Sequence, residues 1–235
     1  MSQTWQQIWS AKGAAVAPQH APDSGTLERL MDLGGYTSPT AAGALSAYER
    51  HFRYVRESLS IGTGDSVYEV GCGAGALLYW LHTHCRQVGG ADFAEPLVQH
   101  ARAALPAADD LVHADADRIE TTPRYDVVLS NGVFLYFASA EYARRVTERM
   151  ITKATRAIGI FDVNDADRRE EALEVRRAAQ RERGLDYSGL EQLFLPRELF
   201  TSIADRHGLE CRIDDTATTA SANARYRYHV TMHRR

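Results

Sequence analysis

A glycine turn between a buried strand and a helix constrains the fold of this chain more than any other feature of its sequence. The largely apolar stretch 66–70 is followed by Gly71-Cys72-Gly73-Ala74-Gly75 and then by the mostly apolar stretch 76–84. A strand that turns on glycines directly into a helix is typical of the first unit of a nucleotide-binding α/β fold. The sequence therefore predicts an α/β protein whose ligand lies beside this turn.

Strands and helices alternate along most of the chain. Apolar stretches bounded by turn residues predict seven strands, at 66–70, 87–92, 110–115, 125–130, 156–162, 209–213 and 225–232. Helical spacing of apolar residues predicts helices at 45–59, 76–84, 95–105, 139–154, 166–184 and 195–208. This alternation indicates a Rossmann-like, doubly wound and mainly parallel sheet, which binds ligands beyond the C-terminal ends of its strands.

The length of 235 residues suits one domain, 1–235. We expect residues 1–44 to form an N-terminal helical cap or lid, because turn formers interrupt its helical stretches. Residues 45–165 are expected to form a cofactor-binding core. Residues 166–235 are expected to supply a substrate-side insertion and the last two strands.

Composition narrows the class of partner. The formal net charge of −4 provides no electrostatic footprint for nucleic acid or for an anionic membrane surface. The three cysteines form no CxxC pair, so neither a disulfide framework nor a thiolate zinc site is indicated. The first residues lack the pattern of a signal peptide. We therefore expect a cytoplasmic protein, a monomer or homodimer, that binds a small molecule rather than nucleic acid or membrane.

The glycine turn alone is compatible with two kinds of ligand. Gly71, Gly73 and Ala76 satisfy the dinucleotide pattern G-x-G-x-x-G/A. However, Glu69 stands two residues before the first glycine, where its carboxylate would repel a pyrophosphate and attract a ligand that carries an ammonium and a sulfonium. The alternative interpretation is that Glu69 only accepts hydrogen bonds from loop amides.

The stretch VYEVGCGAGALLYWL resembles the first motif of the class I S-adenosylmethionine-dependent methyltransferases, an acidic residue followed by G-x-G-x-G. Three further motifs agree in order and spacing over roughly residues 45–165: VGGADFAEPLVQHAR, LVHADADRIE and DVVLSNGVFLYF. The resemblance implies that S-adenosylmethionine is the cofactor and S-adenosylhomocysteine the product. It also implies a seven-stranded sheet with an antiparallel last strand.

The same resemblance implies which residues contact the cofactor. Glu69, Gly71, Cys72 and Gly73 would form the turn around its methionine end, and Asp92 would accept from the ribose hydroxyls. The remaining implied contacts are Phe93 on the adenine face, Asp115 and Ala116 at the adenine amino edge, and Ser130 and Asn131 at the methionine end. We add Tyr36 as a lid residue, and Arg53 as a bidentate partner of the cofactor carboxylate or a surface ion pair.

The chain also departs from the family pattern. No PGG turn precedes the fifth strand, and SNGV stands where base methyltransferases carry an Asn/Asp-Pro-Pro-aromatic motif. This second departure argues against methylation of flipped nucleic-acid bases. We expect a small-molecule methyltransferase of the EC 2.1.1 type that acts on oxygen or nitrogen by in-line displacement, in biosynthesis of specialised (natural-product) metabolites.

A general base is needed only when the acceptor is an alcohol, a phenol or a protonated amine. The candidates are Tyr136, His51 and Asp162. Each also has a structural interpretation: Tyr136 as packing, His51 as an exposed helix residue and Asp162 as the cap of a turn.

Three alternatives remain open at this stage. The oxygen-rich DVND segment at 162–165 is short of ligands for a cation, so we expect no metal. A nicotinamide oxidoreductase shares the glycine turn, and a methyltransferase fold can host other chemistry. The aromatic residues Trp5, Trp9, Tyr187 and Phe194, which belong to the two segments expected to roof the pocket, favour an apolar or ring-bearing acceptor.

Overall fold

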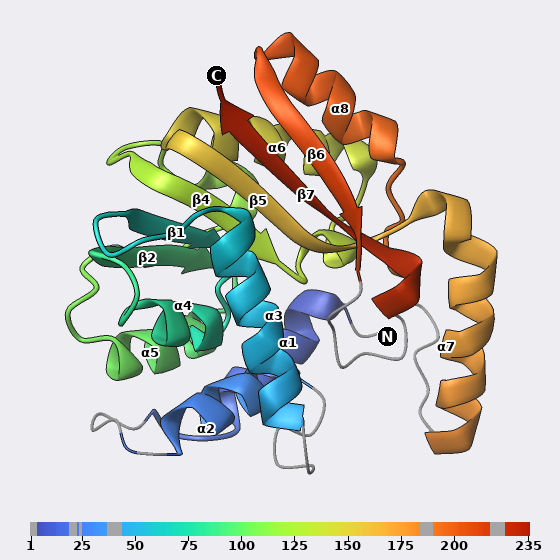
Figure 1. Cartoon of the computed structure of the whole chain (residues 1–235). Helices are drawn as coiled ribbons and strands as arrows, with labels where there is room; N and C mark the ends of the chain where they lie inside the picture. The colour runs from blue at the N-terminus through green and yellow to red at the C-terminus, as the bar shows by residue number, and fades with distance from the viewer. Residues whose placement is uncertain (1–3, 19–22, 24, 37–43, 184–189, 217–223) are drawn as a thin grey trace.

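The computed structural model describes residues 4–18, 23, 25–36, 44–183, 190–216 and 224–235. Its seven strands form one sheet in the order β3-β2-β1-β4-β5-β7-β6 (Figure 1). All neighbouring strands are parallel except β7, which runs antiparallel to both β5 and β6. The predicted doubly wound sheet with an antiparallel last strand is confirmed. The strands are β1 Ser66–Val70, β2 Gln87–Asp92, β3 Leu111–His113, β4 Tyr125–Asn131, β5 Ala154–Asn164, β6 Leu209–Asp215 and β7 Arg227–Arg234.

Helices cover both faces of the sheet (Figure 1). Alternate residues of a strand point to opposite faces, so Val67 packs into the core beneath α3, α4 and α5, whereas Tyr68 packs into the core beneath α6 and α8. The helices are α1 Trp5–Ala14, α2 Thr26–Leu33, α3 Ala44–Ser58, α4 Ala76–Leu81, α5 Glu95–Ala104, α6 Ala140–Lys153, α7 Arg169–Arg183 and α8 Arg197–Arg206. Four short 3₁₀ helices are η1 Ala116–Arg118, η2 Phe134–Tyr136, η3 Ala166–Arg168 and η4 Ala224–Tyr226.

The boundaries of most elements differ from those predicted by one to three residues, and three differences bear on the site or have a clear physical reason. β3 ends at His113 because Asp115 instead caps η1, accepting from the amide of Asp117. α4 ends at Leu81, three residues early, and His84 stacks on Trp80. β5 is longer at both ends than the predicted 156–162 and includes an irregularity in its pairing with β7 between Ile160 and Val163.

The N-terminal cap is fixed to the core through α1 and α5. The backbone of Gly13 approaches Leu97 so closely that a Cβ at residue 13 would lie 2.8 Å from the Leu97 nitrogen. The buried His100 places its Nε2 3.0 Å from the Gly13 carbonyl oxygen. This docking holds Trp5 and Trp9 above the C-terminal ends of the strands.

Within the described ranges, no helix has the length and apolar character that crossing a membrane requires.

Candidate active site

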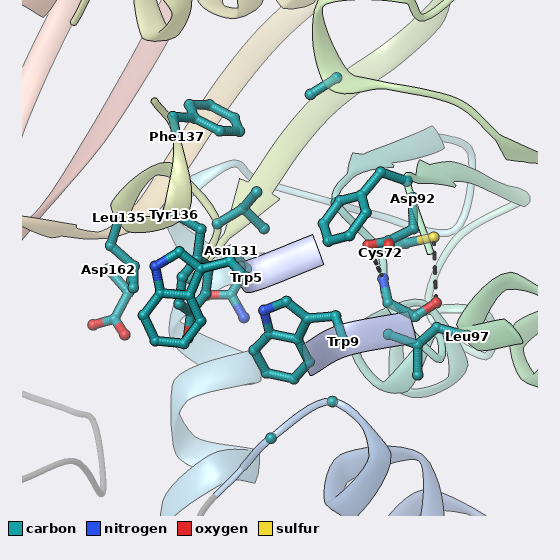
Figure 2. Close-up of a pocket in the computed structure, with 18 of the residues that line it drawn as sticks. Trp5, Trp9, Cys72, Asp92, Leu97, Asn131, Leu135, Tyr136, Phe137 and Asp162 are labelled. Atoms are coloured by element: carbon teal, nitrogen blue, oxygen red, sulfur yellow. Dashed lines mark hydrogen bonds between the residues drawn. The ribbon is translucent and has the colours of Figure 1, made fainter. Parts of the chain in front are cut away.

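A cavity of about 1030 Å³ lies at the C-terminal ends of β1, β2 and β4 (Figure 2). Its lining comes from α1, the glycine turn, the end of β2, the segment after β4 and residues 190–193. A drug-sized ligand occupies a pocket of about 300–1000 Å³. The cavity is therefore large enough for a cofactor beside a second small molecule.

Gly71 and Gly73 of the turn have different structural roles. The amides of Gly71 and Cys72 both donate to the Ala91 carbonyl, at 2.7 and 3.0 Å, which ties the turn to β2. A Cβ at Gly71, where φ is +79°, would lie 2.5 Å from a methyl of Val133, whereas a Cβ at Gly73, where φ is +53°, meets nothing within 4 Å. Gly71 is thus required by packing, and Gly73 leaves the backbone open to a ligand.

Asp92 connects the end of β2 to the turn. Its two carboxylate oxygens accept from the amides of Gly73 and Ala94, each at 2.8 Å. Burial raises the pKa of Asp92, and these two hydrogen bonds oppose that effect. Each oxygen keeps a lone pair for a further donor such as a hydroxyl, and Asp92 lines the cavity, as does Phe93.

The carboxyl group of Glu69 is buried with one of its oxygens unpaired in the described part of the chain. The side chain is 3% exposed, and its Oε2 has no hydrogen-bond partner among the described residues. Burial, together with the charge of Asp92, raises the pKa of Glu69 well above its usual range. A buried acceptor in this state requires a donor or cation from a ligand, and the ammonium of S-adenosylmethionine fits it.

Asp115 is held by a side chain that sequence reasoning missed. The Tyr142 hydroxyl donates to Asp115 Oδ1, and both residues line the cavity together with Ala116. Tyr142 stands in the first turn of α6, directly after the N-cap Ser139. The sequence signal that could have identified Tyr142 was its position in the first turn of the helix that follows the fourth strand, at the ligand-binding edge of the sheet.

His51, Asn131 and Tyr36 form a hydrogen-bonded chain across the other end of the cavity. His51 is 3% exposed, and its Nε2 lies 2.8 Å from Asn131 Oδ1. The Asn131 amide donates to the Tyr36 hydroxyl at 3.1 Å. Because Asn131 presents its oxygen, His51 donates from Nε2, and its buried Nδ1 has no partner among the described residues. Burial raises the pKa of Tyr36, so the phenol stays neutral.

Asp162 stands at the irregularity of β5, with φ +65°. Arg227 donates from Nη1 to Asp162 Oδ2 and from Nε to Asn164 Oδ1 at 3.0 Å. Burial opposes ionisation of Asp162, but the charge of Arg227, with contributions from His51 and His229, outweighs it and holds the pKa below its ordinary value. Asp162 is therefore a carboxylate whose Oδ1 is buried and lacks a partner in the described part of the chain.

Arg227 and His229 are the second set of residues that sequence reasoning missed. They are two residues apart on β7, so they share one face of that strand. The Asp162 amide donates to His229 Nδ1 at 3.0 Å. Burial is the main cause that lowers the pKa of His229 to about 4, which keeps its ring neutral.

An aromatic corner closes the cavity above this end. The ring centroids of Trp5 and Trp9 lie 4.7 and 5.6 Å from that of Tyr136, with interplanar angles of 59° and 73°. Trp5 Nε1 donates to the Glu191 carbonyl at 2.9 Å, so α1 is linked to the segment 190–193. Tyr187 lies outside the described residues, and Phe194 does not line the cavity.

Two predicted cofactor residues do not line the cavity. Arg53 is exposed because α3 buries its neighbours His51, Phe52 and Val55, and residue 53 faces away from them. Ser130 is fully buried, and its hydroxyl donates to the Val70 carbonyl at 2.8 Å, which joins β4 to β1. The predicted contact between Arg53 and a cofactor carboxylate is not supported by this position, and Ser130 has a place in the strand pair instead.

The oxygen-rich segment 162–165 is engaged by arginine. Arg227 donates hydrogen bonds to side-chain oxygens of Asp162 and Asn164, and Arg197 donates to Asp165 at 2.7 Å. Among the described residues, no group of three or more His, Cys, Asp or Glu side chains is arranged to hold a metal ion.

Residues 67–156 match a family described as a methyltransferase domain. The matched segment runs from β1 into β5 and contains Glu69, Asp92 and Asp115. Among curated protein sequences, none matches this chain.

Solved methyltransferase structures share the fold. Magnesium protoporphyrin IX methyltransferase (ChlM) from Synechocystis PCC 6803, with bound SAH, aligns at a TM-score of 0.58 and 18% identity over 83% of this chain and 86% of its own. The N-methyltransferase NodS from Bradyrhizobium japonicum WM9, in complex with S-adenosylhomocysteine, aligns at 0.56 and 17% over 80% and 86%. An S-adenosylmethionine-dependent methyltransferase from Clostridium acetobutylicum aligns at 0.58 and 8% over 80% and 91%.

The family match and the strand order together decide against the nicotinamide alternative. Residues 67–156 therefore match a methyltransferase domain, and the whole chain shares the fold of the solved methyltransferases.

The two glycines of the turn give a matched pair of variants. Both Gly71→Ala and Gly73→Ala place a side chain at positive φ, but only Gly71→Ala collides with Val133. We expect Gly71→Ala to lose more free energy of unfolding than Gly73→Ala by about 1–3 kcal/mol, measured by urea denaturation. Gly73→Ala should fold yet bind S-adenosylhomocysteine at least about tenfold more weakly by calorimetry, because its methyl enters the ligand space. Equal stability losses, or full affinity in Gly73→Ala, would show that these roles are assigned wrongly.

Glu69→Gln tests the uncompensated carboxylate. We expect S-adenosylmethionine to bind about 10- to 100-fold more weakly, as for the loss of a charged hydrogen bond. Because the pKa of Glu69 is raised in the fold, its contribution to stability is full below the ordinary glutamate pKa and is lost as the pH rises through the folded value. Without cofactor, the melting temperature of Glu69→Gln should therefore rise relative to that of the wild type as the pH increases. Glu57→Gln, at an exposed position of α3, is the control; if it behaves like Glu69→Gln, burial is not the cause.

Proposed function

We propose that this protein transfers the methyl group of S-adenosylmethionine to an oxygen or nitrogen atom of a small molecule. The observation that carries the proposal is the cavity itself, which joins two chemically different ends (Figure 2). Asp92 and Asp115 stand at one end, and His51, Asn131 and Asp162 stand at the other. Glu69 lies between the two ends, since it interacts electrostatically with both Asp92 and Tyr36. When bound, S-adenosylmethionine supplies an electrophilic methyl group on a sulfonium.

Residues of the first end, together with Glu69, would bind and orient the cofactor. Glu69 offers its unpartnered oxygen to the ammonium, Asp92 offers lone pairs to the ribose hydroxyls, and Asp115, fixed by Tyr142, accepts from the adenine amino group. Gly73 leaves the backbone open for close approach, and Phe93, which lines the cavity, would lie against the adenine face.

Residues of the second end would exclude water and handle the acceptor proton. Trp5, Trp9 and Tyr136 roof the pocket, which favours alignment of the reacting atoms in a dry space. His51 donates from Nε2 to Asn131, so its Nδ1 carries the lone pair that can accept a proton. Asp162 is paired with Arg227 and is better suited to hold the acceptor than to act as the base.

We also propose that residues 1–235 work as one domain, with the cap 1–44, the core 45–165 and the segment 166–235 all contributing to the cavity. The contacts of α1 with α5, and of Trp5 with Glu191, support this division. A cytoplasmic location, a role in specialised metabolism and a monomeric or homodimeric state stay predictions.

The proposed activity is tested by cofactor selectivity and product formation. S-Adenosylhomocysteine should raise the melting temperature of the protein, and NAD should not, because only a ligand that binds the folded state stabilises it. Incubation with S-adenosylmethionine and a broad panel of alcohols, phenols and amines should yield S-adenosylhomocysteine and a methylated product by mass spectrometry. Tight cofactor binding without any methylated product would contradict the proposal and favour other chemistry on this fold.

His51→Gln separates proton handling from cofactor binding. We expect kcat to fall about 100-fold or more, as for the loss of a general base, while the affinity for S-adenosylhomocysteine stays unchanged. The matched variant Tyr136→Phe keeps the aromatic corner and should retain most of the activity if Tyr136 serves as a wall. A large loss in Tyr136→Phe with an active His51→Gln would assign the base to Tyr136.

A further inference from the structure

The charges that line the cavity are of nearly one sign. Its carboxylates outnumber its cationic side chains by five to one among the described residues. The carboxylates are Glu69, Asp92, Asp115, Asp162 and Glu191, and the cation is Arg227. Such a lining attracts cations and repels anions, and low-dielectric walls strengthen both effects.

Three of these carboxylates are proposed to bind the cofactor. Glu191 is exposed to solvent, so the buried charges of the acceptor end are Asp162 and Arg227. Arg227 is already bound to Asp162 and to Asn164. The pair has no net charge, yet Asp162 Oδ1 remains buried and unpartnered. An acceptor that enters as an anion meets no free cation in the described lining, whereas a hydrogen-bond donor or a cation meets an unused carboxylate oxygen.

The aromatic corner lies at the same end as Asp162. In the view of Figure 2, Trp5 and Tyr136 are on the same side of the cavity as Leu135, Asn131 and Asp162, and Asp92 and Cys72 are on the other side. Aromatic faces set at steep angles to one another attract a cation through their quadrupoles, by about 0.5–2 kcal/mol for each contact. They also accommodate an apolar or ring-bearing body.

We propose that the methyl acceptor is an amine that is cationic in solution and is carried on an apolar or aromatic body. This inference rests on the proposed methyl transfer and names the substrate class of the same cavity. The ammonium binds between the Asp162 carboxylate and the aromatic corner, and the body lies against Trp5 and Trp9.

The chemistry requires one proton acceptor besides the anchor. An ammonium has no lone pair, so it first gives a proton to His51, whose Nδ1 carries the free lone pair. The neutral amine then forms a C–N bond to the methyl carbon while that carbon's bond to sulfur breaks and its electron pair stays on sulfur. The product leaves as the N-methylammonium, and His51 returns its proton to water.

The test compares three probes of one shape with the protein saturated with S-adenosylhomocysteine. The probes are 2-phenylethylamine, 2-phenylethanol and 3-phenylpropionate, which present an ammonium, a hydroxyl and a carboxylate on similar bodies. Binding is followed by calorimetry and by the fluorescence of Trp5 and Trp9, which line the cavity. We expect the amine to bind on the order of tenfold or more tightly than the alcohol, and the acid to bind most weakly.

Asp162→Asn supplies the matched variant. Asparagine tolerates the left-handed backbone at this position and keeps an oxygen for Arg227, but it replaces the free carboxylate oxygen with an amide donor. The preference for the amine should disappear in Asp162→Asn while the affinity for S-adenosylhomocysteine is retained. The melting temperature should fall, because Arg227 loses its charged partner. Asp205→Asn, an exposed position on α8, should keep the preference.

The outcomes separate this inference from the proposed function. Equal binding of amine and alcohol, binding of none of the three probes, or an unchanged preference in Asp162→Asn would overturn the amine assignment. Methylation of hydroxyl acceptors but of no amine in the acceptor panel would also overturn it and would leave methyl transfer itself established. Absence of any methylated product in the panel would instead overturn the proposed function.

Discussion

The site depends on negative charge that the fold buries without a cation of its own. Glu69 and Asp92 lie at the ends of adjacent strands, and burial raises the pKa of both. Two loop amides compensate Asp92, whereas one oxygen of Glu69 has no partner among the described residues. The hydrophobic cores on both faces of the sheet offset the free-energy cost of burying these carboxylates. A permanently cationic ligand removes that cost. A bound cationic cofactor therefore stabilises the carboxylates at the strand ends.

At the acceptor end, the protein itself supplies the cation that compensates the buried carboxylate. Asp162 is compensated by Arg227 from the antiparallel strand β7, and the irregularity of β5 turns its carboxylate into the cavity lining. One oxygen remains available after this pairing. A compensated carboxylate beside the imidazole of His51 suits a group that enters charged and reacts neutral, whereas an uncompensated carboxylate suits a group that stays charged. The difference between the two ends matches the difference between an amine and the cofactor.

The sequence contained enough to predict the sheet and the cofactor end, because both depend on local patterns. Apolar runs mark the strands. Glu69 is the penultimate residue of β1, Asp92 ends β2, and Asp115 comes two residues after the end of β3. The acceptor end depends on contacts that no local pattern encodes. Arg227 reaches Asp162 across 65 positions of sequence. One contact of the cofactor end was equally hidden, because Tyr142 reaches Asp115 across 27 positions. Arg53 was predicted from the match between a guanidinium and a carboxylate, but two steps along a helix turn a side chain by roughly 200°, which puts Arg53 on the side opposite His51, where it is exposed.

Proton release on cofactor binding tests the central claim most directly. A carboxyl group whose pKa is raised by burial holds a proton more often in the empty cavity than in the complex with a cation. Calorimetric titration of S-adenosylmethionine in buffers of different ionisation enthalpy measures the protons exchanged. We predict a net release from the wild type over part of the pH range above the ordinary pKa of a glutamate side chain, and a smaller release from Glu69→Gln. The same proton exchange in both proteins across that range would contradict the account.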